Sequence, residues 1–346
     1  MKAAIFRGGP PYWPKAPLKV EDVDPPAVPP GNVLVRVVAC GLCHTDLLYL
    51  RGDLTPLKDP PIILGHEPSG VVEAVGEGVS GVREGDRVVV SYLIPCGDCV
   101  NCKAGRENIC LNASIVGSSR DGALAEYLSV PEGCVFKLPD GVPLEESAIV
   151  ADALATAYHA IVRRGKLSPN ESVVIYGASG GVGLSAVQVS KLIGAEVIAV
   201  GRKEWKLEVA RRLGASVIIN AVHDARPDKS IIEITGGGAD VAVDATGDSK
   251  VMSLACRSVR RGGRVIIVGY GTEDFLAPSK RVMWYELDVL GSCNYRPSDI
   301  PVLLRLIADS EIRVTELVTR KYSLDDINVA YDVLAKGDVI RALVKP

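Results

Sequence analysis

The chain has 346 residues, of which 47% are apolar and 23% are charged, and its net charge at pH 7 is −3. This composition is typical of a globular protein and excludes a largely disordered or collagen-like chain. The slight negative charge excludes a general attraction to nucleic acid or to an anionic membrane surface. The length exceeds what one hydrophobic core usually holds, so we expect two domains.

The N-terminal stretch "MKAAIFRGG" contains only a short apolar run before glycine, proline and charged residues. Neither a signal peptide nor a membrane span is predicted, and the expected location is the cytoplasm. In that reducing compartment, clustered cysteines bind metal more often than they form disulfides. The chain has one glutamine, Gln188, and three methionines beside abundant Pro, Arg and Glu, a bias that is typical of a thermophile protein.

From residue 1 to about 150, short runs rich in β-branched residues are separated by proline and glycine. This pattern predicts a β-rich domain with long loops. The predicted strands are "NVLVRVVAC" (32–40), "GVVEAVG" (70–76), "DRVVVSYL" (86–93) and "ALAEYLSV" (123–130).

From about residue 170 the pattern changes to a strand, a glycine loop and a helix, repeated along the chain. Continuous apolar strands that alternate with amphipathic helices predict a parallel sheet covered on both faces, as in a doubly wound nucleotide-binding domain. After a last predicted strand at 286–295, the segment 296–346 contains two helical patterns and a final apolar strand. The pattern leaves open whether this segment extends the second domain or returns to the first. The strands are predicted at 172–176, 196–200, 241–245 and 264–270, and the helices at 177–194, 204–214 and 250–259.

Four glycines, Gly177, Gly180, Gly181 and Gly183, lie between the strand and the helix of "VVIYGASGGVG". A backbone without Cβ atoms can approach a pyrophosphate there, at the positive N-terminus of the helix. The strict G-x-G-x-x-G spacing is not met, and close packing of strand on helix is the alternative explanation. The strand before the loop and the helix after it favour a dinucleotide site.

The second strand of this domain ends at Gly201, which is followed by Arg202 and Lys203. Enzymes that prefer NAD usually carry an acidic residue there, which holds the ribose 2′-hydroxyl, whereas basic residues accommodate the 2′-phosphate of NADP. We therefore predict NADP(H) as the preferred cofactor. The alternative is a solvated charge pair in an enzyme that uses NAD or has no preference.

The loop "CGDCVNCKAGRENIC" holds four cysteines in two consecutive C-x-x-C spacings and one longer spacing. Four thiolates in one loop are typical of a tetrahedral structural zinc site, which has no open position and therefore does no chemistry. An iron–sulfur cluster and disulfides are the alternatives. The predicted zinc ligands are Cys96, Cys99, Cys102 and Cys110.

The motifs "GLCHTD", "GHEPSGVVEAVGEGV", "GASGGVG" and "RRGGRVIIVG", together with the cysteine loop, resemble in order and spacing the zinc-containing medium-chain alcohol dehydrogenases. The resemblance covers nearly the whole chain. It implies an α/β protein with a GroES-like catalytic domain (1–151), a Rossmann domain that binds NAD(P) (152–295) and a C-terminal segment (296–346) that returns to the catalytic domain. The cysteine loop then resembles the structural zinc lobe of this family.

The resemblance also implies a catalytic zinc site. Cys43 and His66 match two of the family's ligands, and Asp152 stands where the family normally has a second cysteine. An aspartate oxygen is an acceptable zinc ligand, and with Cys43 it still supplies two negative charges. Glu67 resembles a carboxylate that approaches the metal during ligand exchange, and Asp46 resembles the acid that orients the histidine ligand.

Further roles follow from the same resemblance. Thr45 would take the proton of the substrate hydroxyl. Leu48 replaces a histidine that ends the proton path in many members, so release through the cofactor ribose and water, or slow release, is expected. The cofactor contacts would be His44 to the pyrophosphate, Thr156 and Val182 near the nicotinamide, and Gly269 at the end of "RVIIVG".

The expected function is that of a zinc-dependent, NADP(H)-preferring alcohol dehydrogenase or carbonyl reductase with two zinc ions per subunit. The alternatives are a zinc-free enone or quinone reductase of the same superfamily and a dinucleotide-binding protein without activity. Tyr92 and Trp284 fall where family pockets are lined, which favours bulky, hydrophobic alcohols and ketones, unless Trp284 belongs to the core or to an interface. The family implies a homodimer or homotetramer that pairs an edge strand near "DVLGSC", with no nucleic-acid or membrane partner.

Overall fold

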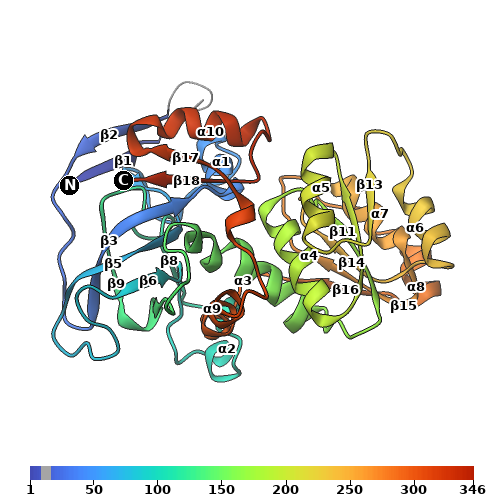
Figure 1. Ribbon diagram of the computed structural model, residues 1–346, viewed down its shortest axis with the longest axis horizontal. Coiled ribbons are helices and arrows are strands. Elements are labelled where there is room, and N and C mark those ends of the chain that lie inside the picture. Colours follow the sequence, from blue (N-terminus) through green and yellow to red (C-terminus); the bar gives the residue numbers. More distant parts are fainter. Residues whose placement is uncertain (9–16) are drawn as a thin grey trace. The chain divides into compact units, whose positions relative to one another are not determined.

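The computed structural model describes residues 1–8 and 17–346. The chain divides into two compact units: unit 1 comprises residues 1–152 and 296–346, and unit 2 comprises residues 153–295. The C-terminal segment, drawn in red in Figure 1, lies among the N-terminal elements of unit 1. Asp152, which the family resemblance assigned to the second domain, is the last residue of unit 1 before the chain enters unit 2.

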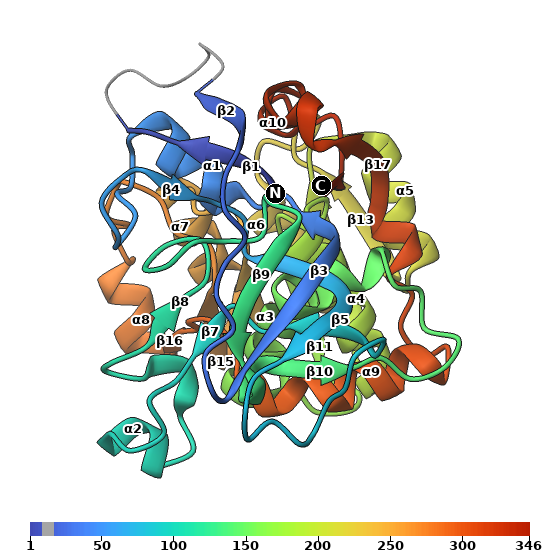
Figure 2. The same cartoon turned by 90° about the vertical axis from the view of Figure 1, so that its left-hand side faces the viewer.

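Unit 1 is built around a seven-stranded sheet in the order β10-β6-β5-β3-β18-β17, with β9 also paired to β3. The long strand β3 runs beside β5 and β9 (Figure 2). Its last residues, Cys40 and Gly41, pair with the C-terminal strand β18, which therefore lies next to the segment that follows β3. The strands are β3 Asn32–Gly41, β5 Glu67–Val75, β6 Arg87–Val90, β9 Tyr127–Pro131, β10 Val135–Lys137, β17 Val318–Ser323 and β18 Arg341–Lys345.

Two smaller sheets and several short helices complete unit 1. One sheet has the order β2-β1-β4 and the other pairs β7 with β8. Both chain termini lie in this unit (Figures 1 and 2). The strands are β1 Lys2–Phe6, β2 Leu18–Asp22, β4 Ile62–Ile63, β7 Leu93–Ile94 and β8 Ser114–Ile115, and the helices are α1 His44–Arg51, α2 Val100–Lys103, α9 Ile300–Ala308 and α10 Ile327–Ala335, with the 3₁₀ turn η3 at Glu146–Ala151.

Unit 2 is a six-stranded sheet in the order β13-β12-β11-β14-β15-β16, and all its strand pairs are parallel. The chain starts in the middle at β11, builds outward to β13, and then returns to β14 on the other side. In doubly wound sheets, ligands bind at the carboxyl ends of the strands where the order reverses. The strands are β11 Ser172–Tyr176, β12 Glu196–Gly201, β13 Val217–Asn220, β14 Ala239–Asp244, β15 Val259–Ile267 and β16 Asp288–Gly291.

Helices cover both faces of this parallel sheet (Figure 1). Because side chains alternate along a strand, Val174 and Tyr176 of β11 share one face, where they pack with Ile231 of α6 and Ala255 of α7. The helices are α3 Ala153–Tyr158, α4 Gly181–Ile193, α5 Glu204–Arg212, α6 Pro227–Thr235, α7 Ser249–Ser258 and α8 Ser279–Tyr285, with the π-helical segment η4 at His159–Arg164.

The sequence pattern was incomplete in several places, and α8 is among the helices that it did not identify. It predicted one strand at 86–93, but the structure has β6 and β7 with a break between them. It did not identify β13 and α6 in unit 2, and it missed β17 in the C-terminal segment. The side chains of β17, "VTRKYS", are mostly exposed because this strand lies at the edge of the sheet, so it lacks an apolar pattern.

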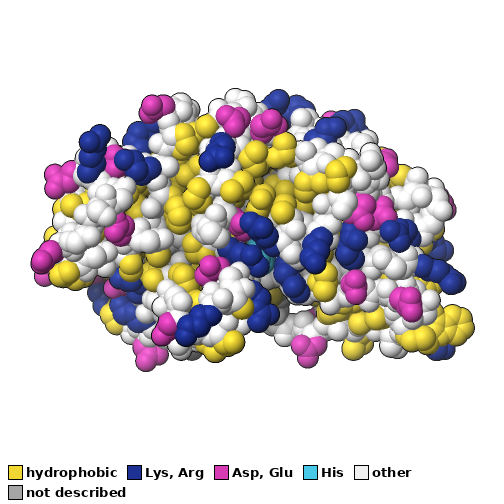
Figure 3. All heavy atoms as spheres, turned by 90° about the horizontal axis from the view of Figure 1, so that it is seen from below, with side chains coloured by type: hydrophobic (Ala, Val, Ile, Leu, Met, Phe, Trp, Pro, Cys, Tyr) yellow, Lys and Arg dark blue, Asp and Glu magenta, His cyan; other side chains and the backbone are white. Residues whose placement is uncertain are grey.

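Among the described helices, none combines the length and the apolarity needed to cross a membrane. Basic and acidic side chains both occur on the face drawn in Figure 3, with uncharged and hydrophobic side chains between them.

Candidate active site and metal centres

The "GLCHTD" segment forms the junction between β3 and α1. Cys43 is the residue before the helix and has extended backbone angles (φ −107°, ψ 154°). The side chain of Asp46, in the first helical turn, reaches back so that its Oδ2 accepts a hydrogen bond of 3.4 Å from the Cys43 backbone N–H. A carboxylate in the first turn also interacts favourably with the helix dipole, so this sequence favours a helix start that projects the Cys43 thiol.

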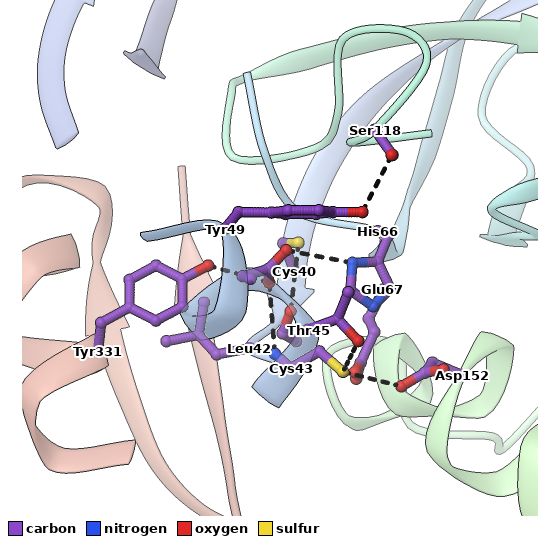
Figure 4. Close-up of polar contacts among 12 residues, drawn as sticks. Cys40, Leu42, Cys43, Thr45, Tyr49, His66, Glu67, Ser118, Asp152 and Tyr331 are labelled. Carbon is purple, nitrogen blue, oxygen red and sulfur yellow. Dashed lines mark hydrogen bonds and ion pairs between the residues drawn. The ribbon is translucent and has the colours of Figure 1, made fainter. Parts of the chain in front are cut away.

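Four side chains of unit 1 converge next to this helix start (Figure 4). One ligand atom from each of Cys43, His66, Glu67 and Asp152 lies within 4.8 Å of all the others. Asp152 follows η3, and the Cys43 Sγ lies 3.4 Å from its Oδ2. His66 directly precedes β5 and Glu67 is its first residue, and the side chains of His66, Glu67 and Asp152 are buried.

Asp46 also sets the orientation of His66. Its Oδ1 lies 3.3 Å from the His66 Nδ1, which leaves the Nε2 of the ring for another ligand. The Tyr92 ring meets the His66 ring edge-on, at 5.3 Å between centroids and an interplanar angle of 82°. Imidazoles that bind metal usually have such a carboxylate on the second ring nitrogen.

A buried arginine that the sequence analysis missed joins this cluster from β18. The Arg341 Nη1 donates to the Glu67 Oε1 at 2.6 Å and to the Leu42 carbonyl at 3.1 Å, and its Nη2 lies 3.4 Å from the Asp152 Oδ2. The signal in the sequence is an arginine inside the apolar strand "VIRALV", because a buried cation needs anionic partners.

Burial and the neighbouring cations shift the pKa values of the carboxyl groups of the cluster in opposite directions. Burial raises the pKa of Glu67 to about 8, although Arg341 opposes this rise. Burial also disfavours the charge of Asp152, but His66 and Arg341 together lower its pKa below the usual value. Burial and the neighbouring Asp152 raise the pKa of the Cys43 thiol. A bound cation reverses this effect, since metal coordination deprotonates a thiol.

The cluster has the donors that a zinc ion takes. A thiolate, an imidazole and a carboxylate are all zinc ligands, and three protein ligands leave a fourth position for a substrate. The Glu67 Oε2 is fully buried and accepts no hydrogen bond from any residue that the structure describes. A buried carboxylate oxygen without a donor is costly, and a nearby cation would compensate it.

The cysteine lobe brings together all four of its predicted ligands, Cys96, Cys99, Cys102 and Cys110. The Cys110 Sγ lies 3.4 Å from the Cys96 Sγ and 3.9 Å from the Cys99 Sγ, and the cysteines are free thiols. The backbone amides of Cys96 and Asn112 donate to the Cys110 Sγ. Backbone amides, that of Cys102 first, also lower the pKa of Cys99 to about 6. Burial raises the pKa of Cys102 to about 12, and Asp98 raises that of Cys96, so these amides favour the thiolate at Cys99 rather than at every ligand of the lobe.

The glycine loop of unit 2 lies between β11 and α4, as the sequence predicted. Gly177 has a positive φ of 78°, a conformation that side chains disfavour. A Cβ on Gly183 would overlap the Gly177 backbone and lie 2.7 Å from the Ala178 Cα, so the helix packs on the loop with no room for a side chain. Gly180 precedes α4, and Gly181 is its first residue, so their amides lie at the helix N-terminus.

The other predicted cofactor residues of unit 2 occupy neighbouring strand ends. Gly201 is the last residue of β12, and a Cβ there would lie 3.0 Å from the Ser179 Oγ of the glycine loop. Arg202 and Lys203 follow it with exposed side chains. Gly269 follows β15, and a Cβ on it would lie 2.9 Å from the Thr246 backbone N. These loops share the carboxyl edge of the parallel sheet.

Several predicted residues lie outside these groups. Thr45 is in α1, with its Oγ1 3.7 Å from the Cys43 Sγ. Trp284 of α8 is 69% exposed, so it is not a core residue of unit 2, whereas Tyr92 is buried. The structure places His44 and Leu48 on α1, Val182 on α4 and Thr156 on α3.

Comparison with known proteins identifies the family. Residues 29–140 match the alcohol dehydrogenase GroES-like domain, and residues 181–309 match the zinc-binding dehydrogenase domain. The chain is 36% identical over 340 residues to an alcohol dehydrogenase from Geobacillus stearothermophilus, covering 98% of this chain and 97% of the relative. The chain belongs to the zinc-type medium-chain alcohol dehydrogenase family. It is therefore an oxidoreductase that acts on CH–OH groups, as the sequence predicted.

Solved structures of alcohol dehydrogenases share the whole fold. An NAD-dependent alcohol dehydrogenase superposes with a TM-score of 0.92 at 31% identity and covers all of both chains. A putative zinc-binding dehydrogenase from Sinorhizobium meliloti, solved with NADP, superposes with a TM-score of 0.88 at 29% identity, covering 100% of this chain and 99% of that one. The predicted fold class, a GroES-like domain with a Rossmann domain, is confirmed.

Proposed function

We propose that this alcohol dehydrogenase is an NADP(H)-preferring enzyme that interconverts alcohols with ketones or aldehydes at a zinc ion held by Cys43, His66 and Asp152. The observation that carries the proposal is the convergence of these three donors beside the unpartnered Glu67 Oε2. Zinc in this site supplies a Lewis acid that polarises the substrate oxygen. Hydride transfer is the chemistry of the nicotinamide cofactor.

The surrounding side chains keep the donor set fixed and move the proton. Asp46 holds the His66 Nδ1 and thereby directs the Nε2 to the metal. Arg341 balances the charge of Asp152 and holds Glu67 back through the bond to its Oε1. Thr45 accepts the proton of the substrate hydroxyl at its Oγ1 and passes it on. Because Leu48 cannot continue a relay, the proton would leave through the ribose of a bound cofactor and water, or leave slowly.

We assign the cofactor to the carboxyl edge of the unit 2 sheet. The amides of Gly180 and Gly181 at the N-terminus of α4 would hold the pyrophosphate, since the helix dipole favours an anion there. Gly177, Gly183 and Gly269 keep the backbone close around it. By resemblance to the family, His44 contacts the pyrophosphate, and Thr156 and Val182 contact the nicotinamide.

Zinc content tests the metal assignment. We expect about two zinc ions per subunit in protein purified without added metal. Asp152→Ala should keep the lobe zinc and lose the cluster zinc together with alcohol oxidation, whereas Cys110→Ser should lose the lobe zinc and keep the cluster zinc. Turnover of an enone by a wild-type protein without zinc would instead establish the alternative, a zinc-free enone or quinone reductase.

The preference for NADP(H) rests on Gly201, Arg202 and Lys203. With no carboxylate at Gly201, the two exposed cations can bind the 2′-phosphate through charge-assisted hydrogen bonds. Replacing both Arg202 and Lys203 with Ser should raise the KM for NADPH at least about tenfold and leave that for NADH unchanged, because even one such bond contributes about 1.5 kcal/mol or more and about 1.4 kcal/mol is a factor of ten. Lys229→Ser, at an exposed position of α6, is the control. Equal effects on both cofactors would contradict the preference.

We also propose that a second copy of the chain pairs with β16. This strand ends the order of the unit 2 sheet, and its neighbourhood exposes Met283, Trp284 and Val289. Analytical sedimentation should show a dimer or tetramer, and Trp284→Lys should shift the equilibrium between oligomer and monomer toward the monomer. A monomeric wild type would exclude this assembly.

A further inference from the structure

The helix α10 brings a buried phenol to the acid behind His66. Tyr331 is fully buried, and its hydroxyl donates a 3.0 Å hydrogen bond to the Asp46 Oδ2. Figure 4 shows the Tyr331 side chain approaching the site from the C-terminal elements, opposite to Asp152. Although 285 positions separate the two residues in the chain, α10 packs directly against α1, which carries Asp46.

The two oxygens of Asp46 have different partners. The Oδ2 accepts hydrogen bonds from the Tyr331 hydroxyl and from the Cys43 backbone N–H, whereas the Oδ1 lies 3.3 Å from the His66 Nδ1. Two donors on one oxygen fix the plane of the carboxylate. Because Asp46 is fully buried, water cannot replace a lost donor without a rearrangement.

The phenol can act as a donor throughout the working pH range. Burial, and after it the negative charge of Asp46, raises the pKa of Tyr331 well above its usual value. The hydroxyl therefore keeps its proton and has an anionic acceptor at all times, which makes this a charge-assisted hydrogen bond.

We propose that Tyr331 is a positioning residue of the cluster: its hydroxyl fixes Asp46, Asp46 fixes His66, and the fixed imidazole retains the metal. The inference rests on the proposed zinc site. A purely structural hydrogen bond would stabilise the fold without affecting metal retention, and the two roles therefore differ in a measurable property.

The test compares two tyrosine variants of the zinc-loaded enzyme. Tyr331→Phe removes one oxygen atom and keeps the ring. Tyr176→Phe is the matched control, because Tyr176 is also buried and its hydroxyl forms a 2.5 Å hydrogen bond with the Ser258 Oγ in unit 2. Both variants should lower the unfolding temperature slightly, since each loses a buried hydrogen bond.

The decisive readout is the rate at which a chelator removes zinc from the cluster. Partners of metal ligands typically change metal affinity 10–100-fold. Tyr331 is one contact further from the metal than Asp46, so we expect Tyr331→Phe to accelerate zinc release by a smaller factor, about threefold to tenfold. The phase of zinc release that is missing in Cys110→Ser belongs to the cysteine lobe, and its rate should not change in Tyr331→Phe. Tyr176→Phe should release zinc at the wild-type rate from both the cluster and the lobe.

A double-mutant cycle tests the route through Asp46. Asp46→Asn should accelerate release more than Tyr331→Phe, and adding Tyr331→Phe to Asp46→Asn should change the rate by less than about twofold. If Tyr331→Phe released zinc at the wild-type rate, or if it had its full effect in the Asp46→Asn background as well, the role of Tyr331 would be overturned and the proposed zinc site would stand. A wild type that holds zinc only in the lobe would overturn the zinc site as well.

Discussion

At the scale of single residues, the charge balance of the cluster depends on Arg341. Its guanidinium contacts Glu67 and Asp152, and all three side chains are buried. Removing one partner from a buried ionic group leaves an uncompensated charge, which typically costs about 3–5 kcal/mol. Arg341→Met should therefore lower the free energy of unfolding by about 3 kcal/mol, as measured by urea denaturation of the zinc-loaded protein.

The conservative variant serves as the control for this prediction. Arg341→Lys keeps the charge but loses the planar fork, so its loss of stability should be clearly smaller. A methionine variant as stable as the wild type would mean that the carboxylates are protonated and need no counter-ion.

Two glycines of the nucleotide loop provide a second comparison. At Gly183 a Cβ would overlap the backbone of Gly177, whereas at Gly180 the nearest atom would be the Gly177 carbonyl oxygen at 3.5 Å. Gly183→Ala gains about 1 kcal/mol of helix propensity, but rigid backbone overlap typically costs about 1–3 kcal/mol. We expect a lower unfolding temperature and weaker NADPH binding for Gly183→Ala, and an unchanged unfolding temperature for Gly180→Ala. Equal unfolding temperatures for the two variants would show that the loop can move.

The residues of the site differed in how visible they were in the sequence. Cys43 and His66 lie in compact motifs, but it was the resemblance of these motifs to the family that selected them as ligands. Asp152 was selected only by resemblance, because an aspartate at the start of a helical pattern has no special signature. Tyr331 carries no local signal of function, and Arg341 has only that of a charge inside an apolar strand, since both roles depend on contacts with residues that are hundreds of positions away in the chain.

At the scale of elements, one carboxylate joins η3 to the C-terminal strands. Glu145, just before η3, accepts hydrogen bonds of 2.7 Å from Lys321 of β17 and from Lys345 of β18. The bond from Lys321, followed by that from Lys345, lowers the pKa of Glu145 below its usual value of 4.5. This carboxylate therefore helps to hold η3, which precedes Asp152, against the sheet.

The lowered pKa predicts a pH dependence of stability. A carboxyl group with a lower pKa in the folded state stabilises the fold above its unfolded pKa and loses this contribution as the pH falls through its folded pKa. Glu145→Gln should thus be less stable than the wild type at pH 7, by less than about 1 kcal/mol because the pair is partly exposed. The difference should disappear at about pH 3 in urea unfolding. A difference that does not depend on pH would indicate packing rather than charge.

The missed strand β17 illustrates what pattern analysis requires of an element. A strand in the middle of a sheet buries at least one face and reads as apolar or alternating, whereas β17 exposes Thr319, Arg320 and Lys321 in a row. It forms because β18 offers its edge as a partner. The presence of a partner strand at that position depends on the tertiary structure and not on the local sequence of β17.

At the scale of the whole molecule, the two units differ in continuity. Unit 2 is one continuous segment that contains its complete sheet, whereas unit 1 needs β17 and β18 from the far end of the chain. We expect a fragment of residues 153–295 to fold and bind the dinucleotide, and a fragment of residues 1–152 not to fold alone. Circular dichroism and hydrogen exchange of the separate fragments test this. A folded 1–152 fragment would show that β18 is dispensable.

The resemblance to the family supplied the donors of the cluster, whereas the sequence by itself determined the two fold classes, the cysteine lobe and the glycine loop. These features depend on short-range spacing: hydrophobic periodicity, consecutive C-x-x-C pairs, and glycines between a strand and a helix. The pattern left the place of the C-terminal segment open and the resemblance assigned it to the first domain, but only the tertiary structure decided that this segment delivers Arg341 and Tyr331 to the cluster. The physical reason is that a buried ion pair and a buried hydrogen bond are favourable only when both partners are desolvated together, and chain folding alone brings such distant partners into contact.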